Sequence, residues 1–191
     1  MRVFILFLVL LVSSCNQKYR EPIVLNSFVS SQSMNQLYKE VSHRHLTLKI
    51  DKDITIYLNS NGGDTQSMLI FIDKLNELRK EGRRFTGVIY GFCYSACGTL
   101  FAAMDHRYMT KDALYMQHNS SYGVFPKPEE LKLKKILDIR RLRYTAKFLK
   151  KPLGYVYNFF TGGGYYVSDG RTMYKEKLID GIVPQPIFDK I

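Results

Sequence analysis

A serine and a histidine stand at positions that suit nucleophilic chemistry. Ser95 lies in Gly91-Phe-Cys-Tyr-Ser-Ala-Cys-Gly98, where a strand pattern gives way to a helix pattern. A serine at a helix start is commonly only an N-cap, but a nucleophile there has the N–H of the next residue, Ala96, as an oxyanion donor. His118 ends the strand pattern Leu114-Tyr-Met-Gln. A lone histidine is more commonly structural, yet at a strand end beside the serine it can serve as a general base.

A pair of glycines forms a second candidate feature. The segment Asn59-Ser-Asn-Gly-Gly63 follows the apolar stretch Asp53–Leu58 and precedes a helical pattern. Glycines leave backbone N–H groups unshielded, so those of Gly62 and Gly63 can stabilise an oxyanion. A tight turn without chemistry explains the same residues. A phosphate loop is excluded, because neither Gly-Lys-Ser/Thr nor G-x-G-x-x-G occurs at this loop.

Two of the three cysteines bracket the candidate serine. Cys93 and Cys97 flank Ser95 closely in sequence. A disulfide between them suits a strand-to-helix turn better than a regular helix, and two buried reduced thiols are the alternative. A thiol nucleophile is the weaker candidate, because it needs a depressed pKa. A zinc site needs further ligands, and His106 and His118 lack finger-like spacing. We therefore expect no metal and no cofactor.

Strand and helix patterns alternate along the chain and predict an α/β fold. Apolar side chains at helical spacing mark residues 64–81 as a helix. Repeated β-α-β order indicates a mostly parallel sheet with covering helices. Because sites in such sheets form at the carboxyl ends of strands, the loops at 59–63 and 91–95 should face one pocket. The predicted strands are 23–29, 53–58, 85–90, 107–109 and 113–117, the other predicted helices are 33–41, with Ser33 as its cap, and 95–104, and residues 91–94 are predicted as a turn.

The N-terminus has the pattern of an export signal. Arg2 precedes an unbroken apolar run, Val3–Val12, which is too short for a membrane-spanning helix of roughly 20 residues. Val12-Ser-Ser-Cys15 resembles the lipobox of a bacterial lipoprotein, which implies that Cys15 is lipidated. An ordinary signal peptide with an incidental cysteine is the alternative.

The lipobox resemblance implies a division of the chain. Residues 1–14 are expected to be a lipoprotein signal peptide and residues 15–22 a lipidated tether to one domain at 23–191. Asn16, directly after the cysteine, implies an exported protein anchored on the periplasm-facing side of an outer membrane. An oxidising compartment of this kind permits the disulfide considered above.

Three segments together resemble a known family. Tyr57-Leu-Asn-Ser-Asn-Gly-Gly63, the Ser95 segment and Tyr115-Met-Gln-His118 are similar, in that order, to the proteolytic subunit of Clp protease and to signal peptide peptidase A. The similarity spans residues 23–186 and implies a Clp/crotonase-like fold. It also implies a serine peptidase without a cofactor, acting on a peptide or protein substrate. The implied roles are Ser95 as nucleophile, His118 as general base, and Gly63 and Ala96 as oxyanion donors, with Gly62 in the same loop.

The chain departs from the family pattern at the third member of the triad. The family has an aspartate shortly before an aromatic-aliphatic-serine triplet, which here is Tyr166-Val-Ser168, so that Gly164 stands where the aspartate belongs. Asp169, just beyond the triplet, is the candidate replacement, and a Ser-His dyad is the alternative. A non-catalytic binding or scaffold lipoprotein is the second functional hypothesis. Asp180 resembles a structural signature of the family. The loop also differs, with Asn61 where the family has proline.

Positive charge is concentrated after the histidine. Lysine and arginine number 28 against 17 acidic residues, for a net charge of +11. Residues 126–152 hold ten of the basic residues, interleaved with apolar ones, which predicts a basic amphipathic helix. Three interpretations of this segment are open. It is a solvated face that covers the core, or a contact for anionic lipid head groups. By the family resemblance, it is a handle-like helix that builds a homo-oligomer. Nucleic acid is not an expected partner, because no recognition motif accompanies the charge.

Overall fold

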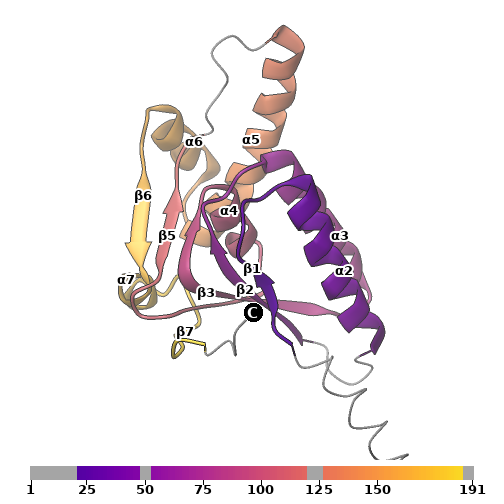
Figure 1. The fold of residues 1–191 in the computed structure, drawn as a ribbon. Coiled ribbons are helices and arrows are strands. Elements are labelled where there is room, and N and C mark those ends of the chain that lie inside the picture. The colour runs from indigo at the N-terminus through magenta and orange to yellow at the C-terminus, as the bar shows by residue number, and fades with distance from the viewer. Residues whose placement is uncertain (1–20, 48–52, 120–126, 187–191) are drawn as a thin grey trace, which may run out of the picture.

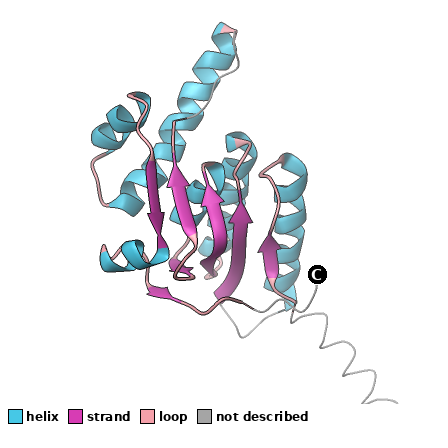
Figure 2. Cartoon of the chain, turned by 60° about the vertical axis from the view of Figure 1, so that its left-hand side comes forward, coloured by secondary structure: helices cyan, strands magenta, loops and turns pink. Residues whose placement is uncertain are grey.

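A mostly parallel sheet forms the centre of the molecule (Figures 1 and 2). The computed structural model describes residues 21–47, 53–119 and 127–186. Within these residues the sheet has seven strands in the order β1-β2-β3-β4-β7, with β5 joined to β3 and β6 joined to β5. Only the β5–β6 pair is antiparallel among them. The strands are β1 (Ile23–Leu25), β2 (Asp53–Ser60), β3 (Arg84–Tyr94), β4 (His106–Met109), β5 (Leu114–Gln117), β6 (Tyr166–Asp169) and β7 (Gly181–Ile182).

Helices cover this sheet, and most of them lie behind the strands in Figure 2. In β2 alternate side chains are buried, as the period of a strand requires, and Ile54, Ile56 and Leu58 are almost fully enclosed. The predicted helical stripe of α3 packs onto the same core, with Leu69 and Ile72 at 0% exposure. The described helices are α2 (Ser31–Thr47), α3 (Thr65–Lys80), α4 (Ala96–Ala102), α5 (Pro128–Leu149), α6 (Leu153–Thr161) and α7 (Gly170–Lys175). The predicted α/β fold is confirmed.

Three local predictions are wrong. The strand predicted at 23–29 ends at Leu25, and Val29 forms only an isolated bridge with Gly63. Residues 91–94, predicted as a turn, continue β3 to Tyr94, because this strand pairs with β4 along its first half and with β5 at its end. Gly91 is needed there because a side chain would overlap the Asn59 amide, whose oxygen accepts the Phe92 N–H at 3.1 Å. The helix predicted at 33–41 spans Ser31–Thr47, and Ser33 is not its cap, because it lies inside the first turn and donates its N–H to the Ser30 hydroxyl at 3.1 Å.

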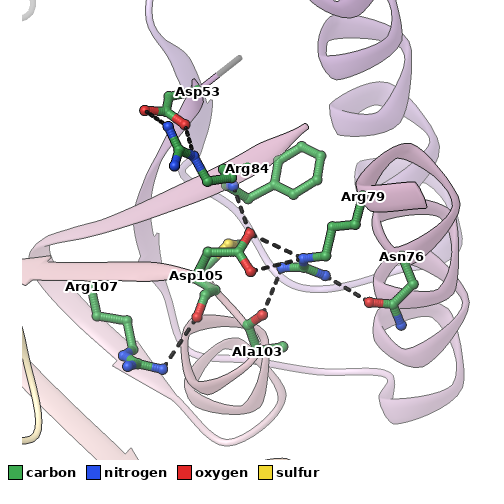
Figure 3. Close-up of polar contacts among 9 residues, drawn as sticks. Asp53, Asn76, Arg79, Arg84, Ala103, Asp105 and Arg107 are labelled. Carbon is green, nitrogen blue, oxygen red and sulfur yellow. Dashed lines mark hydrogen bonds and ion pairs between the residues drawn. The ribbon is translucent and has the colours of Figure 1, made fainter. Parts of the chain in front are cut away.

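A polar cluster fixes the opposite, amino-terminal edge of the sheet (Figure 3). The Asp105 carboxylate accepts two bonds of 3.0 Å from Arg79 Nε and one of 2.8 Å from the Phe85 N–H. Arg79 also donates to the Ala103 carbonyl at 2.8 Å. These contacts tie α3 to the beginning of β3 and to the end of α4. They orient both strand-helix units so that their loops emerge at the other edge.

The predicted basic helix is observed as α5, which ends at Lys150 in a left-handed cap conformation with φ 54°. Its amino-terminal part rises above the rest of the chain in Figure 1, and Leu131, Leu133 and Ile136 are about half exposed there. No helix in the described part of the chain is long and apolar enough to cross a membrane. The predicted signal peptide and Cys15 lie outside the described residues.

Candidate active site

The carboxyl ends of three strands meet at one edge of the sheet. Ser60, at the end of β2, pairs with Cys93 of β3. On the other side of β3, Tyr94 pairs with Met116 of β5. The glycine loop, the segment of Ser95 and the segment of His118 follow these paired positions directly. The predicted gathering of the two loops is therefore observed, and β5 adds the histidine to the same edge.

Ser95 occupies the sharp turn between β3 and α4. Its backbone has φ 55° and ψ −118°, a conformation that costs a non-glycine residue of order 1–3 kcal/mol and persists only where the surroundings hold it. The Ser95 N–H donates to the Met116 carbonyl at 2.8 Å. The Ser95 hydroxyl makes no capping bond to α4, so the N-cap interpretation does not describe it. The turn leaves this hydroxyl available for chemistry.

The glycine loop lies against the turn. A methyl group built on Gly62 would overlap the Tyr94 carbonyl oxygen and come within 2.9 Å of Ser95 Cβ. Gly62 has φ 88°, and its N–H donates to the Ser60 hydroxyl at 3.1 Å. The expectation that Gly62 supplies an oxyanion donor is therefore wrong. Its role is close approach, because only a residue without Cβ fits there.

Two other backbone N–H groups remain for an oxyanion. Val29 and Gly63 form a parallel bridge, in which the bonds run from the Val29 N–H to the Gly62 carbonyl and from the Asp64 N–H to the Val29 carbonyl. No described residue accepts the N–H of Gly63. Ala96 is the first residue of α4, and the first N–H groups of a helix have no intrahelical acceptor. Gly63 and Ala96 are thus the donors that the local backbone leaves for a ligand.

A disulfide closes the turn around the serine. Cys93 in β3 and Cys97 in α4 are bonded, with Cα atoms 5.1 Å apart, and both are fully buried. The bond links the strand to the helix on either side of Ser95. A disulfide sulfur carries no thiolate, so in this oxidised protein neither cysteine is a nucleophile.

His118 follows β5 and is partly buried. Its imidazole stacks on the ring of Tyr165, with ring centres 6.0 Å apart and planes 6° from parallel. Burial lowers the pKa of His118 below 6.5, the nearby Arg141 charge lowers it further, and a hydrogen bond with the Asn119 backbone acts in the opposite direction. The neutral imidazole is therefore favoured. Among the described contacts, no hydrogen bond joins it to the Ser95 hydroxyl, and such pairs often tighten only when substrate binds.

Asp169 is not placed to be the third member of a triad. It pairs with Leu114, four residues before His118 along β5, which corresponds to about 13 Å of strand. Its carboxylate caps α7 by accepting the Thr172 N–H at 2.7 Å, and this bond lowers the pKa of Asp169. The expectation for Asp169 is wrong because a helix start after β6 uses the carboxylate locally.

Gly164 has no room for the carboxylate that the family pattern has at this position. A Cβ built there would lie 2.6 Å from the Phe159 carbonyl oxygen and 2.7 Å from the Phe159 ring. The next residue, Tyr165, instead places its ring against His118. Asp180 has a structural role, because its carboxylate accepts the Arg107 N–H at 2.7 Å where β7 joins β4.

Gln117 is a site residue that the sequence did not single out. It is fully buried, and its amide nitrogen donates to the Ser95 carbonyl at 2.9 Å and to the Thr99 hydroxyl at 3.1 Å. A glutamine next to the histidine, in a strand that is otherwise apolar on that side, was the available signal. It joins β5 to the beginning of α4.

Comparisons with known proteins agree with this geometry. The family model described as Clp protease matches residues 13–149. The fold is similar to the crystal structure of the ClpP protease catalytic domain from Plasmodium falciparum, with a TM-score of 0.69 and 18% sequence identity over 89% of this chain and 90% of that chain. No curated protein sequence matches. Since the family model covers more than half of the chain, and the strand-turn-helix units carry the segments that resemble the family, the chain belongs to the Clp protease family.

Proposed function

We propose that this protein is an exported, lipid-anchored serine peptidase. The observation that carries the proposal is the turn at Ser95, whose hydroxyl is uncapped at a strained backbone position. Beside it lie the N–H groups of Gly63 and Ala96 and the strand that leads to His118. Membership of the Clp protease family supports a peptidase-like activity.

The residues suit acyl transfer through a covalent intermediate. The Ser95 oxygen attacks the peptide carbonyl carbon while His118 accepts the hydroxyl proton, and the carbonyl π electrons move to an oxyanion held by the N–H groups of Gly63 and Ala96. Collapse of the tetrahedral species breaks the C–N bond, and His118 gives its proton to the leaving amine. Water then attacks the acyl-enzyme by the same steps, which release the carboxylic acid and restore Ser95.

The proposed location rests on two features of the chain. The N-terminal pattern that ends at Cys15 resembles a lipoprotein signal. The disulfide between Cys93 and Cys97 suits an oxidising compartment outside the cytoplasm, where such bonds persist. Both features support an extracytoplasmic protein, and the lipobox pattern alone supports an anchor at Cys15.

Hydrolysis by the full-length chain in mild detergent tests the activity. We expect fluorescein-labelled casein to be cleaved, and Ser95→Ala to abolish cleavage down to the rate of the buffer. A p-nitrophenyl ester measured in parallel separates a general esterase from a peptidase. Ester hydrolysis without casein cleavage would contradict the peptidase assignment, and cleavage that survives Ser95→Ala would contradict the nucleophile.

A non-catalytic Clp-like binding protein is the second candidate. The observation that favours it is Gly164, where packing against Phe159 excludes the carboxylate of a complete triad. Loss of that carboxylate costs about 10⁴-fold in turnover where a triad is built to use it. A folded chain that hydrolyses neither casein nor ester would support this candidate.

A further inference from the structure

Arg141 is buried beneath the site and contacts the residues that carry it. Its side chain, on α5, is 1% exposed and is the largest of those fully buried in the described chain. Arg141 Nη1 donates to the Gln117 side-chain oxygen at 3.1 Å and to the His118 carbonyl at 3.0 Å. On its other side, Arg141 Nε lies 3.4 Å from the Asp138 carboxylate, which is also buried.

The contacts of Arg141 continue to the nucleophile. Gln117, which accepts the Arg141 bond, donates in turn to the Ser95 carbonyl at 2.9 Å. One buried chain of hydrogen bonds therefore runs from α5 through the end of β5 to the turn at Ser95. It fixes the backbone of His118 and that of Ser95 from the same guanidinium group.

Anchoring of α5 alone does not call for an arginine. Leu142 and Phe148 already bury this helix against apolar neighbours. Taking a guanidinium group out of water costs several kcal/mol, and apolar replacements of buried ion pairs are often neutral or stabilising. The guanidinium group instead donates to the His118 carbonyl, at the end of β5. In the same site, Gly164 stands where the family pattern has an aspartate.

We propose that Arg141 is a positioning residue of the active site, which holds the strand end of His118 in register with the Ser95 turn through Gln117 and the His118 carbonyl. The inference deepens the proposed function and rests on it. The described hydrogen bonds of Arg141 Nη1 reach the Gln117 side chain and the His118 carbonyl, so it acts through Gln117, through the His118 backbone and through its charge.

The charges around His118 give this role a distinct signature. Arg141 faces it from α5 with the Asp138 carboxylate behind, and the Tyr165 phenol stacks on it from the segment before β6. The Arg141 charge is, after burial, the second cause that lowers the pKa of His118. Removing that charge raises the pKa, so a larger fraction of His118 is protonated at mildly acidic pH and unable to accept the Ser95 proton.

Three variants of the full-length chain test the proposal. Arg141→Met removes the charge and both hydrogen bonds, and Arg141→Lys keeps the charge and a donor. Arg143→Met, at an exposed position on the same helix, is the matched control. The rate of fluorophosphonate labelling is measured from pH 5 to pH 9, a range of about two units on either side of neutrality. The His118 pKa is measured independently by NMR titration of its imidazole signals.

For Arg141→Met we expect labelling about tenfold slower on the alkaline plateau, less than the cost of about 10²-fold for losing a general base outright, because His118 itself remains. We also expect the acid limb of the pH profile, where labelling declines as pH falls, to move to higher pH together with the His118 pKa measured by NMR. Arg141→Lys should keep the wild-type acid limb, and Arg143→Met should match wild type in both readouts. If Arg141→Met does not fold, the double variant Asp138→Leu with Arg141→Met removes the whole buried pair and takes its place in both measurements.

The outcomes separate the two proposals. A folded Arg141→Met chain that labels at the wild-type rate on the alkaline plateau would overturn the positioning role and leave Arg141 as an anchor of α5. If the wild-type chain does not label at all, the proposed function fails, and the NMR titration still decides whether Arg141 controls the His118 charge.

Discussion

His118→Gln is expected to slow fluorophosphonate labelling of Ser95 by about 10²–10⁴-fold, the usual contribution of a positioned general base. Glutamine keeps the size and polarity of the side chain but accepts no proton at neutral pH. The fold should survive, because the described contacts of the imidazole are a stacked ring and a hydrogen bond with the Asn119 backbone, and no buried ion pair is among them. Labelling rates and thermal unfolding of the same samples check both statements.

His106→Gln is the matched control for this experiment. His106 is also a partly buried histidine, but it begins β4 and pairs with Thr86 at the opposite edge of the sheet. It should leave the labelling rate unchanged. Equal labelling by the two variants would mean that His118 is structural and that another group activates Ser95.

The pH dependence of wild-type labelling follows from the same group. Burial and the Arg141 charge lower the pKa of His118 from 6.5, so the base form already dominates at neutral pH. As pH falls through the lowered pKa, the imidazole gains its proton and labelling should decline. The midpoint of this acid limb is expected below pH 6.5, and a midpoint above it would contradict the environment described for His118.

Gly62→Ala is expected to have the second large effect, because it acts on the contact between the glycine loop and the nucleophile turn. The new methyl group would overlap the Tyr94 carbonyl and press on Ser95 Cβ, and neither atom belongs to the far end of a flexible side chain. A displacement of about 1 Å at a reacting group can cost about 100-fold in rate. We expect a loss of that size in labelling, with a destabilisation of about 1–3 kcal/mol from overpacking.

Gly82→Ala separates steric contact from backbone strain. Gly82 has φ 87°, almost the value at Gly62, but no atom lies within 4 Å of a Cβ built there. Both variants carry a similar backbone cost, and only Gly62→Ala carries the clash. Gly82→Ala should lower the melting temperature modestly and label as wild type does. If the two variants label alike, the approach of the loop to Ser95 is not needed for reactivity.

The sequence predicts the sheet and the positions of its loops because apolar residues recur at the strand period in the strands and at the helix period in the helices. The buried alternation of β2 and the apolar stripe of α3 are both recognisable without a structure. The end of β3 is not, because Gly91 resembles a turn signal. In the structure, Gly91 leaves room for the Asn59 side chain, and these two residues are 32 positions apart in sequence.

The parts of the site that the sequence misses depend on long-range contacts. Gly62 is of the residue type expected for an oxyanion donor, but its N–H donates a hydrogen bond to the Ser60 hydroxyl. Asp169 lies near the expected position in sequence, yet the start of α7 uses its carboxylate. Arg141 belongs to a run of basic residues, and only the packing of α5 shows that this one member is buried against Gln117 and His118.

The most direct test of the account is to map the covalent adduct of a fluorophosphonate probe on the full-length chain by mass spectrometry. The account predicts one adduct, on Ser95 in the peptide that spans the β3–α4 turn, which disappears in Ser95→Ala and forms far more slowly in His118→Gln. A folded chain that forms no adduct, under conditions in which a known serine peptidase is fully labelled, would contradict the claim that Ser95 is an activated nucleophile, and so would an adduct at another residue.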